Sequence, residues 1–161
     1  MVSPLDRAPD LVVDPLLVYV RPFARNLIEI MYGKFEIAIW SAGSKKYVEE
    51  ISKFLLADDI KPLFVWDREE CSVEGSFFSF HEVLTKDLEK VKSFGYDLTN
   101  TIIIEDDPIK IRKFRDNAII VKQYFGDNQD DELEKLARYV NVIDIASDIK
   151  RLDKNLWNFN R

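Results

Sequence analysis

Ile102-Ile103-Ile104-Glu105-Asp106-Asp107-Pro108 is the stretch that decides the fold class of this chain of 161 residues. Its three isoleucines predict a short strand buried on both faces, and the carboxylates and the proline predict where that strand ends. Strands of this kind are typical of parallel sheets covered by helices. Because ligands of such sheets bind outside the carboxyl ends of the strands, the three carboxylates stand where a site is expected.

Strand and helix patterns alternate on both sides of that stretch. Further strands are predicted at 35–40, 62–66 and 117–121, with two shorter apolar runs at 11–13 and 16–20. Helices are predicted at 24–31, 45–56, 86–94, 129–140 and 143–152. This alternation predicts an α/β fold, a three-layer sandwich with a mostly parallel central sheet. We interpret residues 1–10 as an irregular lead-in and residues 11–161 as a single domain.

The overall composition excludes several classes of protein. A formal net charge of −6 argues against a general nucleic-acid binder, which needs a basic face. The single cysteine, Cys71, cannot form an internal disulfide, which is compatible with an intracellular, reducing compartment. No apolar run is long enough to span a bilayer, and residues 1–10 resemble neither a secretory signal nor a transit peptide.

Candidate functional residues lie at the ends of two predicted strands and at the start of one predicted helix. Glu105 and Asp106 repel each other unless a hard cation such as Mg²⁺ lies between them; the alternative is a solvated acidic turn that caps a helix. Ser41 ends another strand, where its hydroxyl and the N–H groups around Ala42 can hold a phosphate; the alternative is a serine that merely begins a helix. Lys86 at a helix start opposes the helix dipole, which suggests that it neutralises phosphate; the alternative is a surface lysine.

The order of these signals and the sequence around them resemble one family. The matching segments are Tyr19-Val20-Arg21-Pro22 before a helix, 35–41, Arg68-Glu69-Glu70-Cys71, Lys86-Asp87-Leu88, 102–108, Asp116-Asn117-Ala118-Ile119, and Gly126-Asp127 with the acidic helix start after it. The family is that of the NLI-interacting-factor-like phosphatases, in the haloacid dehalogenase superfamily with its Rossmann-like fold. It includes RNA polymerase II C-terminal-domain phosphatases, Dullard-type nuclear-envelope phosphatases and a mitochondrial import receptor. The resemblance covers residues 16 to about 150 and is specific as an ordered set.

The resemblance implies hydrolysis of phosphoserine or phosphothreonine esters in proteins through an aspartyl-phosphate. It assigns Ser41, with the backbone of Ala42, to the transferring phosphoryl group, and Lys86 to neutralising the charge of phosphate and nucleophile. It assigns Asp106 and Glu105 to Mg²⁺, although Glu105 is one methylene longer than the family's usual aspartate. It also implies a small insertion between the second and third motifs. The family's usual flap hairpin is expected to be reduced or absent in this chain, because few residues precede the first helix.

The family's first motif, Asp-x-Asp-x-Thr or Val after an apolar strand, is absent from this sequence. The nearest match is Leu11-Val12-Val13-Asp14-Pro15-Leu16. Asp14 there takes the place of the nucleophile and of a Mg²⁺ ligand, while Leu16 stands where the general acid belongs. In this fold the first-motif strand lies in the middle of the sheet, and its deletion would leave unpaired backbone groups on both sides.

Three interpretations of residues 11–20 remain open. We favour the first, in which residues 11–13 fill the centre of the sheet and bring Asp14 into the site. In the second, residues 16–20 fill the centre and Arg21 is nearest the site. In the third, residues 11–20 are a remnant of the flap hairpin, and the central strand lies on a further N-terminal piece or on another chain.

Under each interpretation the isolated chain is expected to be a poor phosphatase, because loss of a general acid costs on the order of 100- to 10,000-fold. One function is a weakly active, Mg²⁺-dependent phosphatase in which Asp14, Ser41, Lys86 and Asp106 converge. The other is a pseudophosphatase that serves as a protein-binding or scaffold subunit, as in the import-receptor branch. We expect a phosphoprotein or other protein partner in the cytoplasm or nucleus, with mitochondria as the alternative; the oligomeric state stays open.

Overall fold

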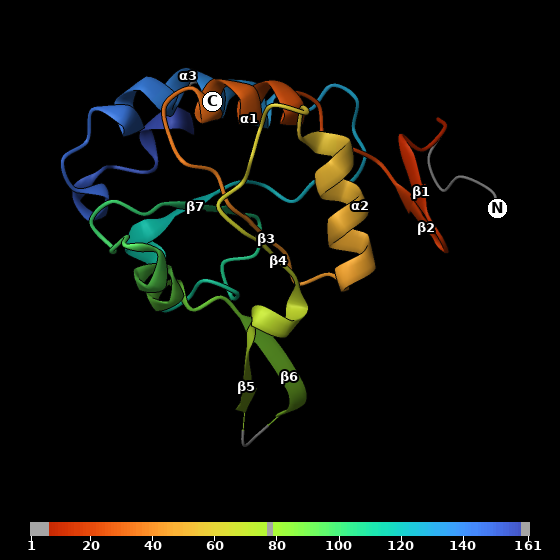
Figure 1. The fold of residues 1–161 in the computed structure, drawn as a ribbon, viewed down its shortest axis with the longest axis horizontal. Helices are drawn as coiled ribbons and strands as arrows, with labels where there is room; N and C mark the ends of the chain where they lie inside the picture. The colour runs from red at the N-terminus through yellow and green to blue at the C-terminus, as the bar shows by residue number, and fades with distance from the viewer. Residues whose placement is uncertain (1–6, 77–78, 159–161) are drawn as a thin grey trace.

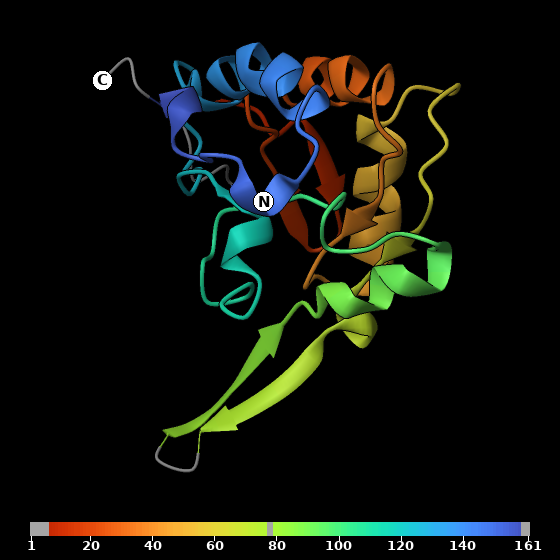
Figure 2. The same cartoon turned by 90° about the vertical axis from the view of Figure 1, so that its left-hand side faces the viewer.

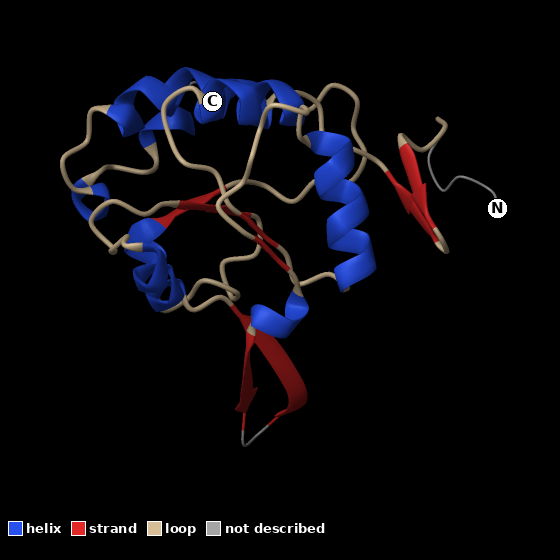
Figure 3. Ribbon diagram, viewed as in Figure 1, coloured by secondary structure: helices blue, strands red, loops and turns tan. Residues whose placement is uncertain are grey.

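The computed structural model describes residues 7–76 and 79–158 and has an α/β architecture (Figure 1). Its strands are β1 (Leu11–Val13), β2 (Leu16–Val18), β3 (Ile39–Trp40), β4 (Val65–Trp66), β5 (Ser72–Ser76), β6 (Ser79–Thr85), β7 (Ile103–Glu105) and β8 (Ala118–Ile120). Its α-helices are α1 (Ala24–Tyr32), α2 (Lys45–Leu55) and α3 (Glu132–Asp144). Its 3-10 helices are η1 (Arg68–Glu70), η2 (Leu88–Phe94), η3 (Arg115–Asn117), η4 (Ile149–Arg151) and η5 (Leu156–Asn158). Figure 3 shows short strands in the middle of the molecule with helices around them.

Strand pairing is local throughout the described residues. Strands there form four two-stranded sheets, of which β3–β4 and β7–β8 are parallel and β1–β2 and β5–β6 are antiparallel. The parallel pairs follow from their connections, since α2 joins β3 to β4 and a turn-rich segment with η3 joins β7 to β8. Where we predicted one central sheet, the described residues hold two separate parallel pairs.

The favoured prediction that residues 11–13 fill the centre of the sheet is wrong. β1 pairs with β2, with Val13 opposite Leu16. This hairpin contacts α2 and lies on the side of α2 away from β7 (Figure 1). Asp14 and Pro15 alone separate the two strands, and a two-residue connection between apolar runs is typical of a hairpin. The pairing agrees with the flap-hairpin interpretation of this segment.

One face of β7 and β8 is covered by α1 and α3, which lie side by side in both ribbon views (Figures 1 and 2). Apolar residues of α3 recur at three- and four-residue spacing and form one buried stripe, made of Leu133, Leu136, Tyr139, Val140 and Ile143. Leu27 of α1 and Ile119 of β8 pack against this stripe. Burying each such leucine or isoleucine contributes roughly 1.5–3 kcal/mol, so this cluster anchors β8 to the helices.

The opposite face of β7 and β8 is covered by η2 and by the segment that follows β7. Leu88 and Ile111, at 2% and 0% exposure, pack there against Ala118 of β8. Trp40 of β3 packs against the same cluster. The β3–β4 pair is therefore joined to β7–β8 by side chains, although no strand pairing links the two in the described part of the chain.

Other predicted elements are found with altered limits. The hairpin β5–β6 forms the expected insertion and projects from the body of the molecule (Figure 2). Lys86 precedes η2 instead of starting a helix, because the Asp87 side chain caps η2 by accepting the Glu89 N–H. The separate helix predicted at 143–152 is wrong, since α3 continues to Asp144 and only the short η4 follows. None of the helices in residues 7–76 and 79–158 is long and apolar enough to cross a membrane.

Candidate functional site

A cavity of about 370 Å³ lies where the carboxyl ends of β3 and β7 come together. Its lining combines the two strand ends with residues from five other segments. The strand ends contribute Trp40, Ser41, Ala42, Ile104, Glu105 and Asp106, and the other segments contribute Arg21, Lys86, Lys110, Val121, Tyr124 and Leu133. The cavity stands at the edge where the sequence predicts a site, since both strands present their carboxyl ends to it. Of the predicted site residues, only Asp14 is not in its lining.

Ser41 and Ala42 offer hydrogen-bond donors to this cavity. The Ser41 N–H donates to the Trp66 carbonyl at 2.9 Å, which fixes the residue at the end of β3. Its Oγ accepts the Gly43 N–H at 3.1 Å, so the hydroxyl proton remains for a ligand. The Ala42 N–H has no acceptor among residues 7–76 and 79–158. A hydroxyl and a backbone N–H side by side suit a phosphoryl oxygen.

Lys86 and Glu105 form a buried ion pair in the cavity wall. Nζ and Oε2 are 2.5 Å apart, and the two side chains are 7% and 5% exposed. The second carboxylate oxygen accepts the N–H groups of Asp106 and Asp107 at 3.1 and 3.2 Å. Burial alone would raise the pKa of Glu105, but Lys86 first, and then hydrogen bonds with the Asp106 side chain and the Asp107 N–H, bring the pKa below its ordinary value. Glu105 is thus ionised, and both its oxygens are occupied within the protein.

The described residues do not fit a magnesium site. Mg²⁺ is held by oxygen ligands in near-octahedral geometry, with one or two carboxylates free to bind it. Glu105 is paired with Lys86, so Asp106 is the remaining carboxylate of this acidic pair that could bind the ion. The pKa of Asp106 is raised by desolvation and by the charge of Glu105, against the opposing effect of Lys110. Within residues 7–76 and 79–158 there is no group of three acidic, histidine or cysteine side chains that could hold a metal.

Asp14 lies away from the other predicted site residues. It occupies the turn between β1 and β2, where it is exposed. The base of this hairpin is fixed by Asp10, whose carboxylate accepts the Val20 N–H at 2.9 Å and pairs with Arg7 at 2.9 Å. The structure therefore gathers the predicted phosphate-binding residues with the acidic pair, but it does not gather Asp14, Glu105 and Asp106 as one set of metal ligands.

Lys110 is a site residue that the motifs in the sequence do not indicate. It lines the cavity, and its carbonyl accepts the Lys86 N–H at 2.7 Å. Its ammonium is 3.8 Å from the Asp107 carboxylate, a long contact that leaves it available to an anion. The lysine stands three residues after Asp107, a spacing that brings side chains together in helical turns and could have revealed it.

Two further residues support this site without offering free groups to a ligand. Gly43 is required in the turn after Ser41, because a Cβ there would lie 2.8 Å from the Tyr47 ring. Arg21 binds both oxygens of Asp130 at 2.7 and 2.8 Å and holds the pKa of that carboxyl below its ordinary value. Arg21 thus holds neighbouring segments in place and does not offer its charge to a ligand. Gly43 could have been found from the sequence, because a glycine between the serine that ends a strand and the start of a helix is typical of a tight turn.

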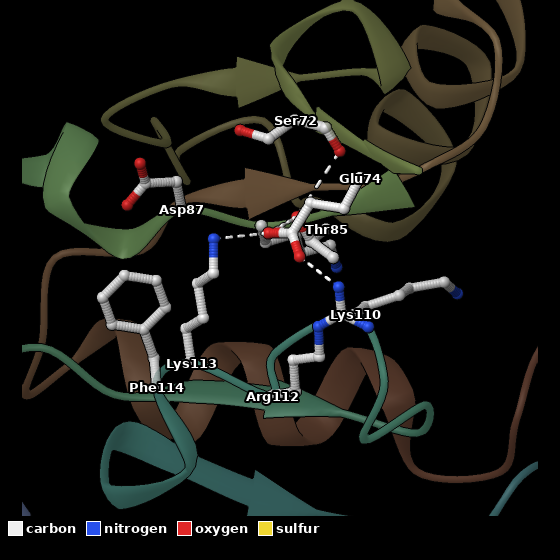
Figure 4. A pocket seen from close by; sticks show the side chains of 9 residues that line it. Ser72, Glu74, Thr85, Asp87, Lys110, Arg112, Lys113 and Phe114 are labelled. Atoms are coloured by element: carbon white, nitrogen blue, oxygen red, sulfur yellow. Dashed lines mark hydrogen bonds and ion pairs between the residues drawn. The ribbon is translucent and has the colours of Figure 1, made fainter. Parts of the chain in front are cut away.

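A second cavity of about 250 Å³ shares Lys86 and Lys110 with the first (Figure 4). Glu74 of the β5–β6 hairpin reaches into it and forms ion pairs with Lys113 at 2.7 Å and with Arg112. The Thr85 hydroxyl donates to the same carboxylate at 3.0 Å. These contacts, with Lys113 first, lower the pKa of Glu74 to about 2. The hairpin is thereby tied to the segment that follows β7.

Comparison with known proteins agrees with the resemblance. The sequence model of the NLI interacting factor-like phosphatase family matches residues 9–150. The chain is 29% identical over 136 residues to the "Probable C-terminal domain small phosphatase" of Dictyostelium discoideum, covering 83% of this chain and 41% of that protein. It is 27% identical over 143 residues to "CTD nuclear envelope phosphatase 1" of Xenopus laevis, covering 86% and 54%. It is 27% identical over 135 residues to "Carboxy-terminal domain RNA polymerase II polypeptide A small phosphatase 2" of Homo sapiens, covering 82% and 46%. The chain spans about half the length of these relatives.

Proposed function

This chain belongs to the NLI interacting factor-like phosphatase family, and from that premise we propose that it binds phosphoserine or phosphothreonine in a protein partner and hydrolyses it weakly or not at all. The proposal includes a haloacid-dehalogenase-like, three-layer arrangement of the domain. In its support, helices α1 and α3 cover one face of β7–β8, and η2 covers the other.

One observation carries the proposal: the donors that suit a phosphate meet at one cavity, and Asp14 is elsewhere. Ser41 and Ala42 contribute a hydroxyl and an N–H, Lys110 contributes an ammonium group, and the Lys86 ammonium lies in the same wall in its pair with Glu105. Each hydrogen bond to a charged group contributes about 1.5–3 kcal/mol, so this set can hold a phosphoryl group. Hydrolysis also needs an attacking carboxylate, and the exposed turn that holds Asp14 does not line the cavity.

A second candidate is a scaffold subunit that binds a partner without catalysis. It is favoured by the Lys86–Glu105 pair, in which the cation and the carboxylate expected to serve phosphate and metal neutralise each other at 2.5 Å. Both candidates imply a protein partner. We further propose an intracellular location, the nucleus or cytoplasm with mitochondria as the alternative, in line with the RNA polymerase II and nuclear-envelope names of the relatives.

Binding is tested by fluorescence anisotropy with a labelled phosphoserine peptide and its unphosphorylated twin. Ser41→Ala removes one donor and is expected to weaken binding of the phosphopeptide about 10-fold, from a loss of about 1.5 kcal/mol. Ser44→Ala is the matched control, since Ser44 is exposed and its side chain makes no capping hydrogen bond. Equal affinity for both peptides, or an equal loss in both variants, would refute the binding proposal.

Turnover is tested with p-nitrophenyl phosphate, with and without Mg²⁺, for the original protein and for Asp14→Asn. We expect the rate to be the same in both proteins and to respond little to Mg²⁺, because Asp14 is outside the cavity lining. Mg²⁺-dependent hydrolysis that Asp14→Asn abolishes would make Asp14 the nucleophile, and the proposal of impaired catalysis would then be wrong.

A further inference from the structure

The second cavity, of about 250 Å³, already contains a bound carboxylate, which comes from the protein itself. Oε1 of Glu74 accepts the Lys113 ammonium at 2.7 Å and the Thr85 hydroxyl at 3.0 Å. Oε2 accepts an N–H of the Arg112 guanidinium. Figure 4 shows the Glu74 carboxylate between Lys113 and Arg112. We call Thr85, Arg112 and Lys113 the donor triad, since all three side chains donate to one anion.

The two cations of the donor triad have more hydrogen-bonding capacity than Glu74 uses. A guanidinium can donate two parallel N–H groups to one anion, and a lysine ammonium has several donors. Among residues 7–76 and 79–158, the side chains of Arg112 and Lys113 each make one contact, and both contacts are with Glu74. Two positive charges therefore face one carboxylate, and the fork of the guanidinium is only partly used.

Both cations can be reached from solvent, and Glu74 is carried by a projecting hairpin. The side chains of Arg112 and Lys113 are 44% and 65% exposed, whereas Glu74 is 19% exposed. Strands β5 and β6 pack chiefly against each other, and Figure 2 shows them extending away from the helices. The backbone ladder holds the two strands together without the Glu74 side chain. An external anion can thus replace this carboxylate while the hairpin stays paired.

The other charges in the wall of this cavity are engaged elsewhere in the protein. Lys86 is paired with Glu105, and Lys110 lies 3.8 Å from the Asp107 carboxylate. The Asp87 carboxylate accepts the N–H group that begins η2. The attraction of this cavity for an anion therefore rests on the donor triad and on the exchange of Glu74.

We propose that the donor triad binds a phosphate monoester, which takes the place of the Glu74 carboxylate. Such an ester carries about −1.5 to −2 charges at pH 7 and three acceptor oxygens, so it matches two cations better than one carboxylate does. Two of its oxygens can accept parallel N–H groups of Arg112, of which Glu74 uses one. The two cavities adjoin, because they share Lys86 and Lys110. The ester is a second phosphorylated residue of the same protein partner, an assignment of its source that rests on the proposed function.

The site itself is tested with N-acetyl-phosphoserine amide, added to isotope-labelled protein at constant ionic strength. Two-dimensional NMR at about pH 7.5, where the ester is mostly dianionic, follows each cavity separately. We expect saturable shifts of the Thr85 and Lys113 amides. The Ser41 and Ala42 amides report on the first cavity, so a failure of the proposed function is seen there and a failure of the donor triad is seen at Thr85. Absence of a saturable response at Thr85 and Lys113 overturns the proposal.

Two variants distinguish exchange of Glu74 from a purely structural tie. Glu74→Gln removes the competing charge and is expected to tighten binding of the ester, followed at Thr85, at least ~5-fold. Glu134→Gln is its control, because it makes the same change of net charge in the exposed pair with Arg138. Lys113→Met should weaken binding at Thr85 at least ~10-fold. Unchanged or weaker binding in Glu74→Gln, or an equal gain in Glu134→Gln, would show that Glu74 is a tie and not a resident ligand.

Peptides identify the source of the ester. Fluorescence anisotropy compares peptides that carry two phosphoserines, with about one to four residues between them, with their two singly phosphorylated counterparts. At the best spacing we expect the doubly phosphorylated peptide to bind at least ~10-fold tighter, because the second phosphate binds at a high effective concentration. Lys113→Met should abolish this advantage, and Lys53→Met, which alters an exposed pair with Glu50, should keep it. If the Thr85 amide responds to the ester but no spacing gives an advantage, the assignment to a phosphorylated polypeptide is wrong.

Discussion

Replacing Lys86 with methionine removes one charge of the buried ion pair while it keeps a side chain of similar length. Glu105, 5% exposed, then retains its two backbone N–H donors but loses the cation 2.5 Å away. Removing one partner of a buried pair costs about 3–5 kcal/mol, because the other charge stays uncompensated. Lys86→Met should therefore lower the free energy of unfolding at pH 7 by about 3–5 kcal/mol, a large share of the ~5–15 kcal/mol typical of a domain.

The pH dependence gives this prediction a second signature. In the original protein the pKa of Glu105 is lowered, so the stabilisation is present above its ordinary pKa of 4.5 and is lost as pH falls through the lowered value. In Lys86→Met the effect of burial, which raises the pKa, is no longer opposed by Lys86. The folded variant then takes up a proton at higher pH than the unfolded chain does. The loss of free energy of unfolding caused by Lys86→Met should therefore be largest at pH 7 and become smaller as the pH falls toward about 5.

Urea unfolding followed by tryptophan fluorescence at the two pH values measures both effects. The control Lys53→Met breaks an exposed pair with Glu50, at 72% and 47% exposure, and should cost no more than about 1 kcal/mol. Adding Glu105→Leu to Lys86→Met removes both charges and should restore most of the lost stability. A loss below about 1 kcal/mol for Lys86→Met, or a loss independent of pH, would refute this account of the pair.

Three other predictions concern buried or tied side chains. Asn117→Ala should cost about 2–3 kcal/mol in urea unfolding, because Nδ2 donates to the carbonyls of Leu98 and Thr101 at 2.6 and 2.7 Å and both would be left unpaired; a loss under about 0.5 kcal/mol would contradict these bonds. Leu136→Ala, at 0% exposure, should cost about 2–5 kcal/mol by the same method, and a loss below about 1 kcal/mol would show that α3 is not packed as described. Glu74→Gln should speed amide exchange of Thr85, because it weakens both the Thr85–Glu74 hydrogen bond and the ion pairs that tie the β5–β6 hairpin to the segment after β7. In the original protein the Glu74 contacts are present above the ordinary carboxyl pKa of 4.5 and are lost as the pH falls through about 2. The exchange rate of the Thr85 amide, corrected for its intrinsic pH dependence, should therefore rise between pH 5 and pH 2. A corrected rate that stays constant over this range would contradict the role of Glu74.

Most of the site could be predicted from the sequence because its signals are local to strand ends. Ser41 and the acidic turn at Glu105 each follow an apolar run, and parallel strands bring such ends together. The partner of Lys86 was not predictable in this way. The lysine meets Glu105 through a contact between distant segments, and no helical or strand spacing relates the two residues.

The two apolar runs near the N-terminus, Leu11–Val13 and Leu16–Val18, were assigned wrongly because an argument about the whole sheet was preferred to the local hairpin pattern. Two short runs separated by Asp14-Pro15 have the spacing of a hairpin, and the structure forms that hairpin. The favoured interpretation placed Leu11–Val13 in the sheet because a parallel sheet needs its centre filled. Local turn chemistry prevailed, since pairing two adjacent runs orders far less chain than a distant parallel pairing does.

The division of the sheet into two parallel pairs has a consequence for how the molecule folds. Each pair joins strands that are close in the sequence, β3 with β4 and β7 with β8, so each forms with little loop-closure entropy. What unites them is side-chain packing, above all that of α1 on α3. Two early-forming halves and a late docking step are therefore expected. A conservative change at Leu27, the buried residue of α1, should then chiefly speed unfolding and leave the folding rate nearly unchanged.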